Sequence, residues 1–331
     1  MVTQSLIQEL RAIEGARLWT NAPLAPFTTI GTGGRAGLLV TVATPSALAL
    51  VLGGVEGAGI PWLSLGAGSN LLVADQGYSG VLIKLDEDFQ YLEGLPDRAG
   101  ERPAGEEMRL TAGAGAYLAR LSAVVAEAGL SGLEFSCGIP GSVGGGVAMN
   151  AGAHGSSMAN VVEAVEFVSA SGISWVSAEA LEWSYRSCGV PRGSVVTAAR
   201  LRLVSGDAES ILQFQRALLR TRRQTQPRGN RTFGSVFKNP PGESAGRLLD
   251  AAGLKGVHRG GAEVSTVHAN FVVNMGDATT ADVLALMGLM RQGVHRMSGI
   301  LLEPEVKLLG APFPWESPSR ELSAEPSDPN G

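Results

Sequence analysis

The segment that most constrains the fold lies at residues 134–155 and reads EFSCGIPGSVGGGVAMNAGAHG. Seven of the eighteen residues from Gly138 to Gly155 are glycine. Glycine loses more backbone entropy on folding than any other residue, so such a segment needs a compensating role. A second glycine loop, SLGAGSNLLV at residues 64–73, lies between apolar runs. Two such loops predict one large anionic cofactor held from both sides by backbone N–H groups; tight turns between strands are the alternative.

Composition sets limits on the class of protein. The 331 residues include 44% hydrophobic and 17% charged residues, which is typical of a globular chain of two or three domains. A net charge of −5 and only 5% aromatic residues argue against a nucleic-acid partner. The two cysteines and four histidines show no metal-ligand spacing, so we expect no metal site.

The N-terminus has no signal-peptide pattern and no apolar run is long enough for a membrane span. We therefore expect a cytoplasmic protein without membrane insertion, and nothing in the sequence indicates an obligate protein partner.

The hydrophobic pattern predicts three α+β units and a tail. We place these units at 1–90, 91–205 and 206–310, followed by a disordered tail, rich in Pro, Ser and Glu, at 311–331. Strands are expected at 38–43, 62–66, 80–85, from 108 and at 194–204, with a hairpin over 161–178. Helices are expected after Thr44 or Ser46, at 116–129, 207–227, 244–254 and 279–299; 262–274 and 301–310 look like strands.

The first glycine loop is not the fingerprint of a doubly wound dinucleotide-binding fold. That fingerprint needs a helix directly after the glycines and an acidic residue about 20 positions on. Here Gly66–Asn70 is followed by Leu-Leu-Val, which reads as a strand, although Asp86 stands at a suitable distance. The loops instead suit a cofactor bound between two mixed α+β subdomains.

Six phrases occur in order between about Asn21 and Gly310, nearly the whole chain. They are GAGSNLLV, GIPGSVGGGVAMNAGAHG, YRSCGVP, GSVFKNP, GGAEVSTVHANFVVN and LEPEVKLLG. Together they resemble the UDP-N-acetylenolpyruvoylglucosamine reductase (MurB) family. About 45 residues without a tyrosine separate the YR and GSVF phrases, which resembles the shorter, second subtype of that family.

The resemblance implies an α+β fold of the vanillyl-alcohol-oxidase type, in which 1–90 and 91–205 are FAD-binding subdomains and 206–310 is the substrate-binding domain. It implies non-covalent FAD, NADPH as the reductant and UDP-N-acetylenolpyruvoylglucosamine as the substrate. It also implies a role in peptidoglycan precursor synthesis. The residues that it assigns to FAD are Gly66, Ala67, Gly68, Ser69, Asn70, Gly138, Ile139, Pro140, Gly141, Ser142, Val143, Gly144, Gly145, Ala148 and Gly152. Thr28–Gly34 is a further expected FAD-contacting turn, although Arg35 stands where the family commonly has proline.

The resemblance also assigns three catalytic residues. Reduction of an enol ether conjugated to a carboxylate needs a hydride donor, a cation at the developing enolate and a proton donor. Arg186 matches the enolate-stabilising arginine, Ser235 the proton-donating serine and Glu305 the catalytic glutamate. Glu303, two residues away and expected on the same strand face, is the alternative carboxylate.

Three residues are expected to bind the nucleotide sugar, namely Lys238, Asn239 and Arg223. Arg223 belongs to a cluster with Arg220 and Arg222 that is either a phosphate site or a solvated helix end. His268 is either a ligand contact or a core histidine. A different flavin-dependent oxidase or dehydrogenase of the same fold remains the alternative function.

Overall fold

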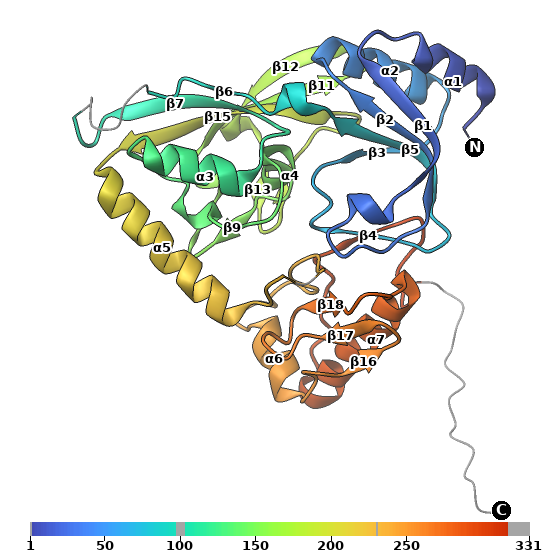
Figure 1. Cartoon of the computed structure of the whole chain (residues 1–331), viewed down its shortest axis with the longest axis vertical. Coiled ribbons are helices and arrows are strands. Elements are labelled where there is room, and N and C mark those ends of the chain that lie inside the picture. Colours follow the sequence, from blue (N-terminus) through green and yellow to red (C-terminus); the bar gives the residue numbers. More distant parts are fainter. Residues whose placement is uncertain (1, 97–102, 230, 317–331) are drawn as a thin grey trace, which may run out of the picture.

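A computed structural model describes residues 2–96, 103–229 and 231–316. Two sheets occupy one side of the molecule, and a smaller C-terminal unit lies below them, joined by the long helix α5 (Figure 1). Across the described chain, no helix is long and apolar enough to cross a membrane. The α+β class expected from the sequence is confirmed.

The first sheet contains four strands in the order β1-β2-β5-β3. Its elements are β1 (Ala16–Pro23), β2 (Arg35–Val42), β3 (Trp62–Leu65) and β5 (Tyr78–Leu85), with helices α1 (Gln4–Arg11) and α2 (Pro45–Gly57). Thr44 caps α2, since its hydroxyl accepts a hydrogen bond from the Ala47 N–H at 3.1 Å. After the first glycine loop the chain forms the short strand β4 (Leu71–Val73) and no helix, which confirms that the doubly wound fingerprint is absent.

The second sheet is antiparallel and has the order β12-β11-β15-β7-β6, with β8 paired to the end of β15. Its strands are β6 (Leu92–Glu93), β7 (Glu107–Gly113), β8 (Leu130–Ser131), β11 (Val162–Ser169), β12 (Gly172–Ser177) and β15 (Val195–Ser205). The expected hairpin is confirmed by the β11–β12 pairing. Helix α3 (Leu118–Glu127) and the small pairs β9 (Gly152–Ala153) with β10 (Ser156–Ser157) and β13 (Trp183–Ser184) with β14 (Ser187–Cys188) complete this part.

The long glycine segment differs from our expectation, because part of it is helical. Helix α4 (Val143–Ala148) begins after Ser142, whose hydroxyl accepts from the Gly145 N–H at 3.3 Å. A Cβ on Gly144 would lie 2.8 Å from Ala114 Cβ, and one on Gly146 would lie 2.6 Å from Leu118 Cδ1. The glycines therefore allow a helix to pack closely, although their low helix propensity hides it in the sequence.

The three expected helices of the last third of the chain are present: α5 (Ala208–Thr225), which leads into the C-terminal unit, and α6 (Ala245–Ala251) and α7 (Thr280–Ser298) within it. Its strands are β16 (His258–Arg259), β17 (Ala262–Val264) and β18 (Val272–Asn274). The strand expected at 262–274 is interrupted, since the Ser265 hydroxyl accepts from the N–H groups of Val267 and His268 in a turn. The run at 301–310 is a strand only at β19 (Lys307–Leu309).

Two contacts fix the C-terminal unit to the first sheet's side of the molecule. β19 pairs in parallel with β4, directly after the first glycine loop. At the start of α7, the N–H groups of Thr280 and Ala281 donate to the Asp75 carboxylate at 2.9 and 2.8 Å. A carboxylate is favourable at a helix N-terminus. The segment before β19 is thereby held against the first glycine loop.

Part of the expected tail is packed. Phe313 is buried in the hydrophobic core of the C-terminal unit and stacks on Trp315, which contacts the Arg291 guanidinium. The remainder of the expected tail, residues 317–331, lies outside the described residues.

Candidate active site

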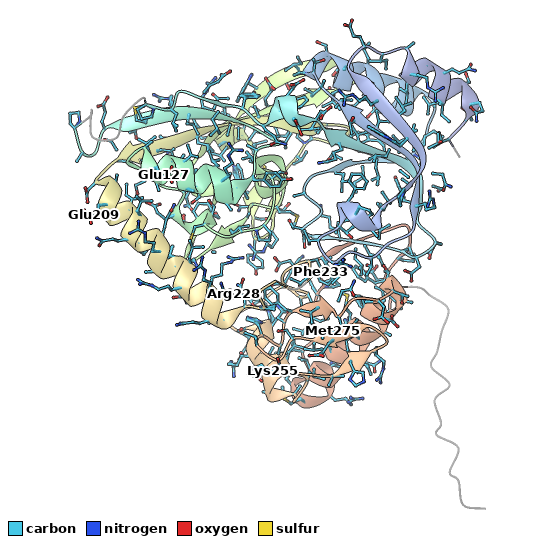
Figure 2. The ribbon with its side chains drawn as sticks, in the orientation of Figure 1. Glu127, Glu209, Arg228, Phe233, Lys255 and Met275 are labelled. Atoms are coloured by element: carbon cyan, nitrogen blue, oxygen red, sulfur yellow. The ribbon has the colours of Figure 1, made fainter. Side chains whose placement is uncertain are left out.

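A cavity of about 820 Å³ is lined by both glycine loops, the end of α5 and segments of the C-terminal unit. In Figure 2, Arg228 lies just beyond α5 and Phe233 lies on the side of the C-terminal unit that faces the sheets; both residues line this cavity. The lining also includes Arg186, Ser235 and Glu305. Residues from three distant parts of the sequence, about 50 and 70 positions apart, thus face one space.

The two glycine loops are directly connected. The Ser69 hydroxyl donates to the Pro140 carbonyl at 2.8 Å, and a Cβ on Gly66 would lie 3.0 Å from the Ser142 hydroxyl. Gly68 has φ +68°, and a Cβ there would lie 1.9 Å from the Phe27 carbonyl oxygen. Only glycine fits at this position without movement of the backbone.

The loops fit an anionic cofactor such as FAD. Within the described chain, the N–H groups of Ala67, Gly68, Ser69, Gly141 and Ser142 donate no hydrogen bond. Backbone amides that converge on a cavity and lack partners favour an anion, most often a phosphate.

Every residue that the sequence assigned to FAD lines the cavity except Val143. Val143 is fully buried in the core of the second sheet and does not line the cavity, so its contact with FAD stays a prediction that the cavity does not support. Thr28–Gly34 does not line the cavity either; the Thr29 N–H donates to the Gly68 carbonyl at 3.1 Å, so this turn supports the loop from behind.

Arg186 lies at the tip of the two-residue turn between β13 and β14. Its φ is +62°, which is uncommon for a side chain other than glycine. Its guanidinium lies 4.9 Å from the centre of the Tyr185 ring, and Nη1 donates to the Gly152 carbonyl at 3.3 Å. The turn directs the Arg186 side chain inward, where it is only 20% exposed.

Arg186 and Glu305 form a largely buried ion pair. Arg186 Nε lies 2.6 Å from Glu305 Oε1, and the two side chains are 20% and 13% exposed. The Nε–H is not aligned for a hydrogen bond to this oxygen and has no other partner in the described chain, so we treat the contact as a charge interaction. Burial raises the pKa of Glu305, while the charges of Arg186 and Lys238 oppose that rise.

Backbone hydrogen bonds fix Glu305 beside Ser235. The Glu305 N–H donates to the carbonyl of Val236 at 2.8 Å, and Ser235 itself is bridged to Phe271. The Asn70 side-chain amide donates to the Glu305 carbonyl at 3.1 Å. The first glycine loop, the serine and the glutamate therefore form one connected framework.

The Glu303 side chain lies in solvent and not in the cavity. It is 76% exposed and its carboxylate lies 3.4 Å from the Lys238 ammonium. The two glutamates do not share a strand face, because residues 301–306 do not form a strand. Glu305 and not Glu303 faces the cavity.

We expect Glu305→Gln to lower turnover far more than Glu303→Gln. Loss of the buried charge next to Arg186 should lower turnover roughly 30-fold, which corresponds to about 2 kcal/mol for a charge-assisted contact. Loss of an exposed ion pair should change turnover by less than about threefold. Steady-state assays of both variants decide the point, and an inverted ranking would show that the wrong glutamate is assigned.

The three residues expected to contact the substrate lie in different positions relative to the cavity. Lys238 does not line the cavity and pairs with Glu303 at its edge. Asn239 lines the cavity, while its side-chain oxygen accepts from the Ala245 N–H at 3.0 Å at the start of α6. Arg223 lines both the cavity and a neighbouring hollow of about 380 Å³.

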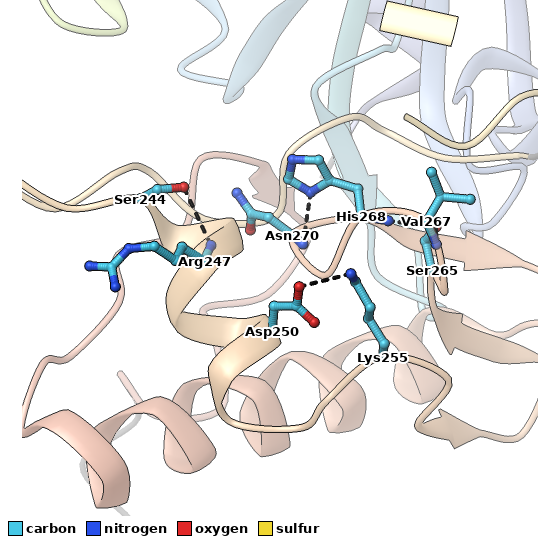
Figure 3. Close-up of polar contacts among 8 residues, drawn as sticks. All are labelled: Ser244, Arg247, Asp250, Lys255, Ser265, Val267, His268 and Asn270. Atoms are coloured by element: carbon cyan, nitrogen blue, oxygen red, sulfur yellow. Dashed lines mark hydrogen bonds and ion pairs between the residues drawn. The ribbon is translucent and has the colours of Figure 1, made fainter. Parts of the chain in front are cut away.

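His268 does not line the cavity. Figure 3 shows its Nδ1 accepting a hydrogen bond from the Asn270 N–H, at 3.1 Å, and its ring contacts Phe271 edge-on. Burial lowers the pKa of His268, and the charge of Lys255 lowers it further. These contacts describe a structural histidine, the second of the two readings of the sequence.

The sequence did not single out several polar side chains of the cavity. They are Gln90, Tyr117, Gln226, Arg228 and Lys307. Arg222 also lines the cavity, although the sequence placed it only in a basic cluster. Helical spacing offered a signal for Arg222, because Gln215, Leu219 and Arg222 lie on one face of α5.

The fold and the cavity define a flavin-binding protein of the α+β class, and residues 36–177 match the family model described as FAD binding domain. Residues 226–309 match the model of the UDP-N-acetylenolpyruvoylglucosamine reductase C-terminal domain. The chain belongs to the UDP-N-acetylenolpyruvoylglucosamine reductase family.

Similar proteins cover most of the chain. The reductase of Anaeromyxobacter sp. (strain Fw109-5) is 48% identical over 290 residues, 88% of each chain. That of Bacillus subtilis (strain 168) is 38% identical and covers 93% of this chain and 99% of its own. The crystal structure of the Thermus caldophilus enzyme has a TM-score of 0.75 at 37% identity, covering 89% of this chain and 98% of that one.

Proposed function

We propose that this protein reduces UDP-N-acetylenolpyruvoylglucosamine to UDP-N-acetylmuramate in peptidoglycan precursor synthesis. The observation that carries the proposal is the single cavity in which Arg186, Ser235 and Glu305 face the two glycine loops. Membership of the reductase family supports the same reaction. We further propose that the protein acts in the cytoplasm and belongs to the shorter subtype.

The glycine loops would hold FAD through their unpaired backbone N–H groups, with Ser69 and Ser142 at the junction of the loops. When bound, FAD would supply the hydride-transfer chemistry that links NADPH to the vinyl carbon of the substrate. The protein must therefore bind both ligands in the same cavity and keep water from the reacting carbons.

Arg186 stabilises the negative charge that develops on the substrate carboxylate. A guanidinium stays charged when buried and can grip a carboxylate with two hydrogen bonds. Glu305 holds Arg186 in place through the ion pair, in which the buried Nε lies against the Glu305 carboxylate. The Ser235 hydroxyl gives its proton to the second carbon, beside these charges.

The substrate diphosphate is expected to meet Arg223 and Asn239 at the end of the cavity formed by the C-terminal unit. Lys238 acts on the site through its positive charge, which lowers the pKa of Glu305.

We retain the division of the chain near residues 90 and 205, because the hydrophobic clusters change there. The C-terminal unit then extends to Trp315.

The purified protein is expected to be yellow and to release its flavin on acid precipitation. This follows from a cavity that binds FAD by backbone contacts without a covalent link. The assay is the absorbance of the supernatant and the pellet after acid treatment, followed by NADPH turnover with the nucleotide sugar. Flavin that stays with the pellet, or turnover with simple alcohols instead, would favour a different flavoenzyme of this fold.

A further inference from the structure

The neighbouring hollow of about 380 Å³ adjoins the cavity and shares part of its wall. Arg223, Gln226, Pro227 and Arg228 line both spaces. The rest of the hollow is formed mainly by the C-terminal unit, from β17, the turn that follows it and the end of β18. Figure 2 shows Arg228 just beyond α5 and Met275 in the C-terminal unit, and both line the hollow. A ligand that is too long for the cavity can therefore extend into it.

The hollow combines positive charge with apolar surface. Arg223 and Arg228 are exposed, and neither forms an ion pair with another described residue. Val267 and Met275 are 47% and 61% exposed, which leaves apolar atoms free for contact. Glu263 adds one carboxylate to the lining. Arginine binds phosphate with a planar pair of donors, and apolar side chains pack on flat rings, so this lining suits a phosphorylated nucleoside.

Charge distinguishes the two nucleotides that the proposed reaction uses. The diphosphate and the carboxylate of the nucleotide sugar have partners in the cavity, and its uridine end carries no further charge. NADPH carries an additional 2′-phosphate on its adenosine, and proteins commonly accommodate this group with an arginine. Its nicotinamide must reach the flavin inside the cavity, so the adenosine end has to lie away from the flavin. A positively charged hollow that opens from the cavity wall meets this requirement.

We propose that the hollow binds the phosphorylated adenosine of NADPH. Arg228 contacts the additional phosphate, Val267 and Met275 pack on the adenine, and Glu263 accepts a hydrogen bond from the adenine amino group. The inference rests on the proposed function, since it takes NADPH as the reductant. It assigns the preference for NADPH over NADH to Arg228, because NADH differs only by the absence of this phosphate.

Stopped-flow reduction of the holoprotein flavin tests the assignment without the nucleotide sugar. Arg228→Met should raise the Kd for NADPH roughly 10-fold, between the effect of an exposed ion pair and that of a charge-assisted hydrogen bond. The Kd for NADH and the limiting rate of flavin reduction should stay the same. Arg228→Lys should recover part of the loss. Arg216→Met is the control, because Arg216 is exposed on α5 and lines neither space.

Calorimetric titration of the holoprotein measures binding without turnover. Adenosine 2′,5′-bisphosphate should bind Arg228→Met more weakly than the parent, whereas adenosine 5′-monophosphate should bind both equally. Equal weakening of NADPH and NADH would place Arg228 at the diphosphate and overturn the inference. Unchanged NADPH affinity in Arg228→Met, with or without a higher KM for the nucleotide sugar, would also overturn it. A parent flavin that NADPH does not reduce would overturn the proposed function as well.

Discussion

Ser235→Ala is expected to retain flavin reduction by NADPH and to lose rapid reoxidation by the enolpyruvyl substrate. The first half-reaction requires no proton from Ser235, so addition of NADPH should bleach the flavin at the parent rate. The second requires protonation of the substrate carbon, and should slow by roughly 10²–10⁴-fold, the range of a lost general acid. Substrate affinity should change much less, because the hydroxyl acts mainly in the transition state.

Stopped-flow absorbance measures the two halves separately. Ser235→Thr is the matched control, since it keeps a hydroxyl at the position and should retain more of the reoxidation rate than the alanine variant. Equal slowing of both halves, or reoxidation of Ser235→Ala at the parent rate, would remove Ser235 from the role of proton donor.

Arg186→Lys is expected to lower turnover by roughly 10²–10³-fold, the effect of removing a group that stabilises a developing oxyanion. The lysine keeps the charge but loses the planar two-point contact with a carboxylate. FAD content should stay the same, because Arg186 belongs to the β13–β14 turn and not to either glycine loop.

The control for Arg186 is Arg192→Lys, an exposed arginine in the loop that follows. It should leave turnover unchanged. Steady-state rates with NADPH and the nucleotide sugar, together with flavin content per protein, make the comparison. Parent-like turnover in Arg186→Lys would mean that its buried ion pair is structural only.

Much of the fold could be predicted from the sequence, because the spacing of apolar residues and the helix-capping residues agree with the packing in the structure. Thr44 preceded a strongly apolar helix, and the alternation in 161–178 produced the β11–β12 hairpin. Helix α4 was missed because its sequence, VGGGVA, has poor intrinsic helix propensity. Its glycines serve close packing against Ala114 and Leu118, which a single sequence cannot reveal.

The sequence predicted only part of the site, because side-chain direction depends on tertiary packing. The short motifs shared with the family pointed to Arg186, Ser235 and Glu305, but they did not distinguish residues that face the cavity from their neighbours. Val143 was assigned to FAD along with the rest of its loop, yet as the first residue of α4 it points into the core. Lys238 and Glu303 pair at the cavity edge, a contact formed across 65 residues of sequence. Such pairings depend on the tertiary fold.

The central claim is that one cavity carries electrons from NADPH through FAD to an enolpyruvyl nucleotide sugar. An anaerobic titration of the purified holoprotein tests it most directly. We predict that one equivalent of NADPH bleaches the flavin and that one equivalent of UDP-N-acetylenolpyruvoylglucosamine restores the colour, with UDP-N-acetylmuramate found by mass spectrometry. A flavin that NADPH bleaches but this substrate leaves bleached would contradict the claim.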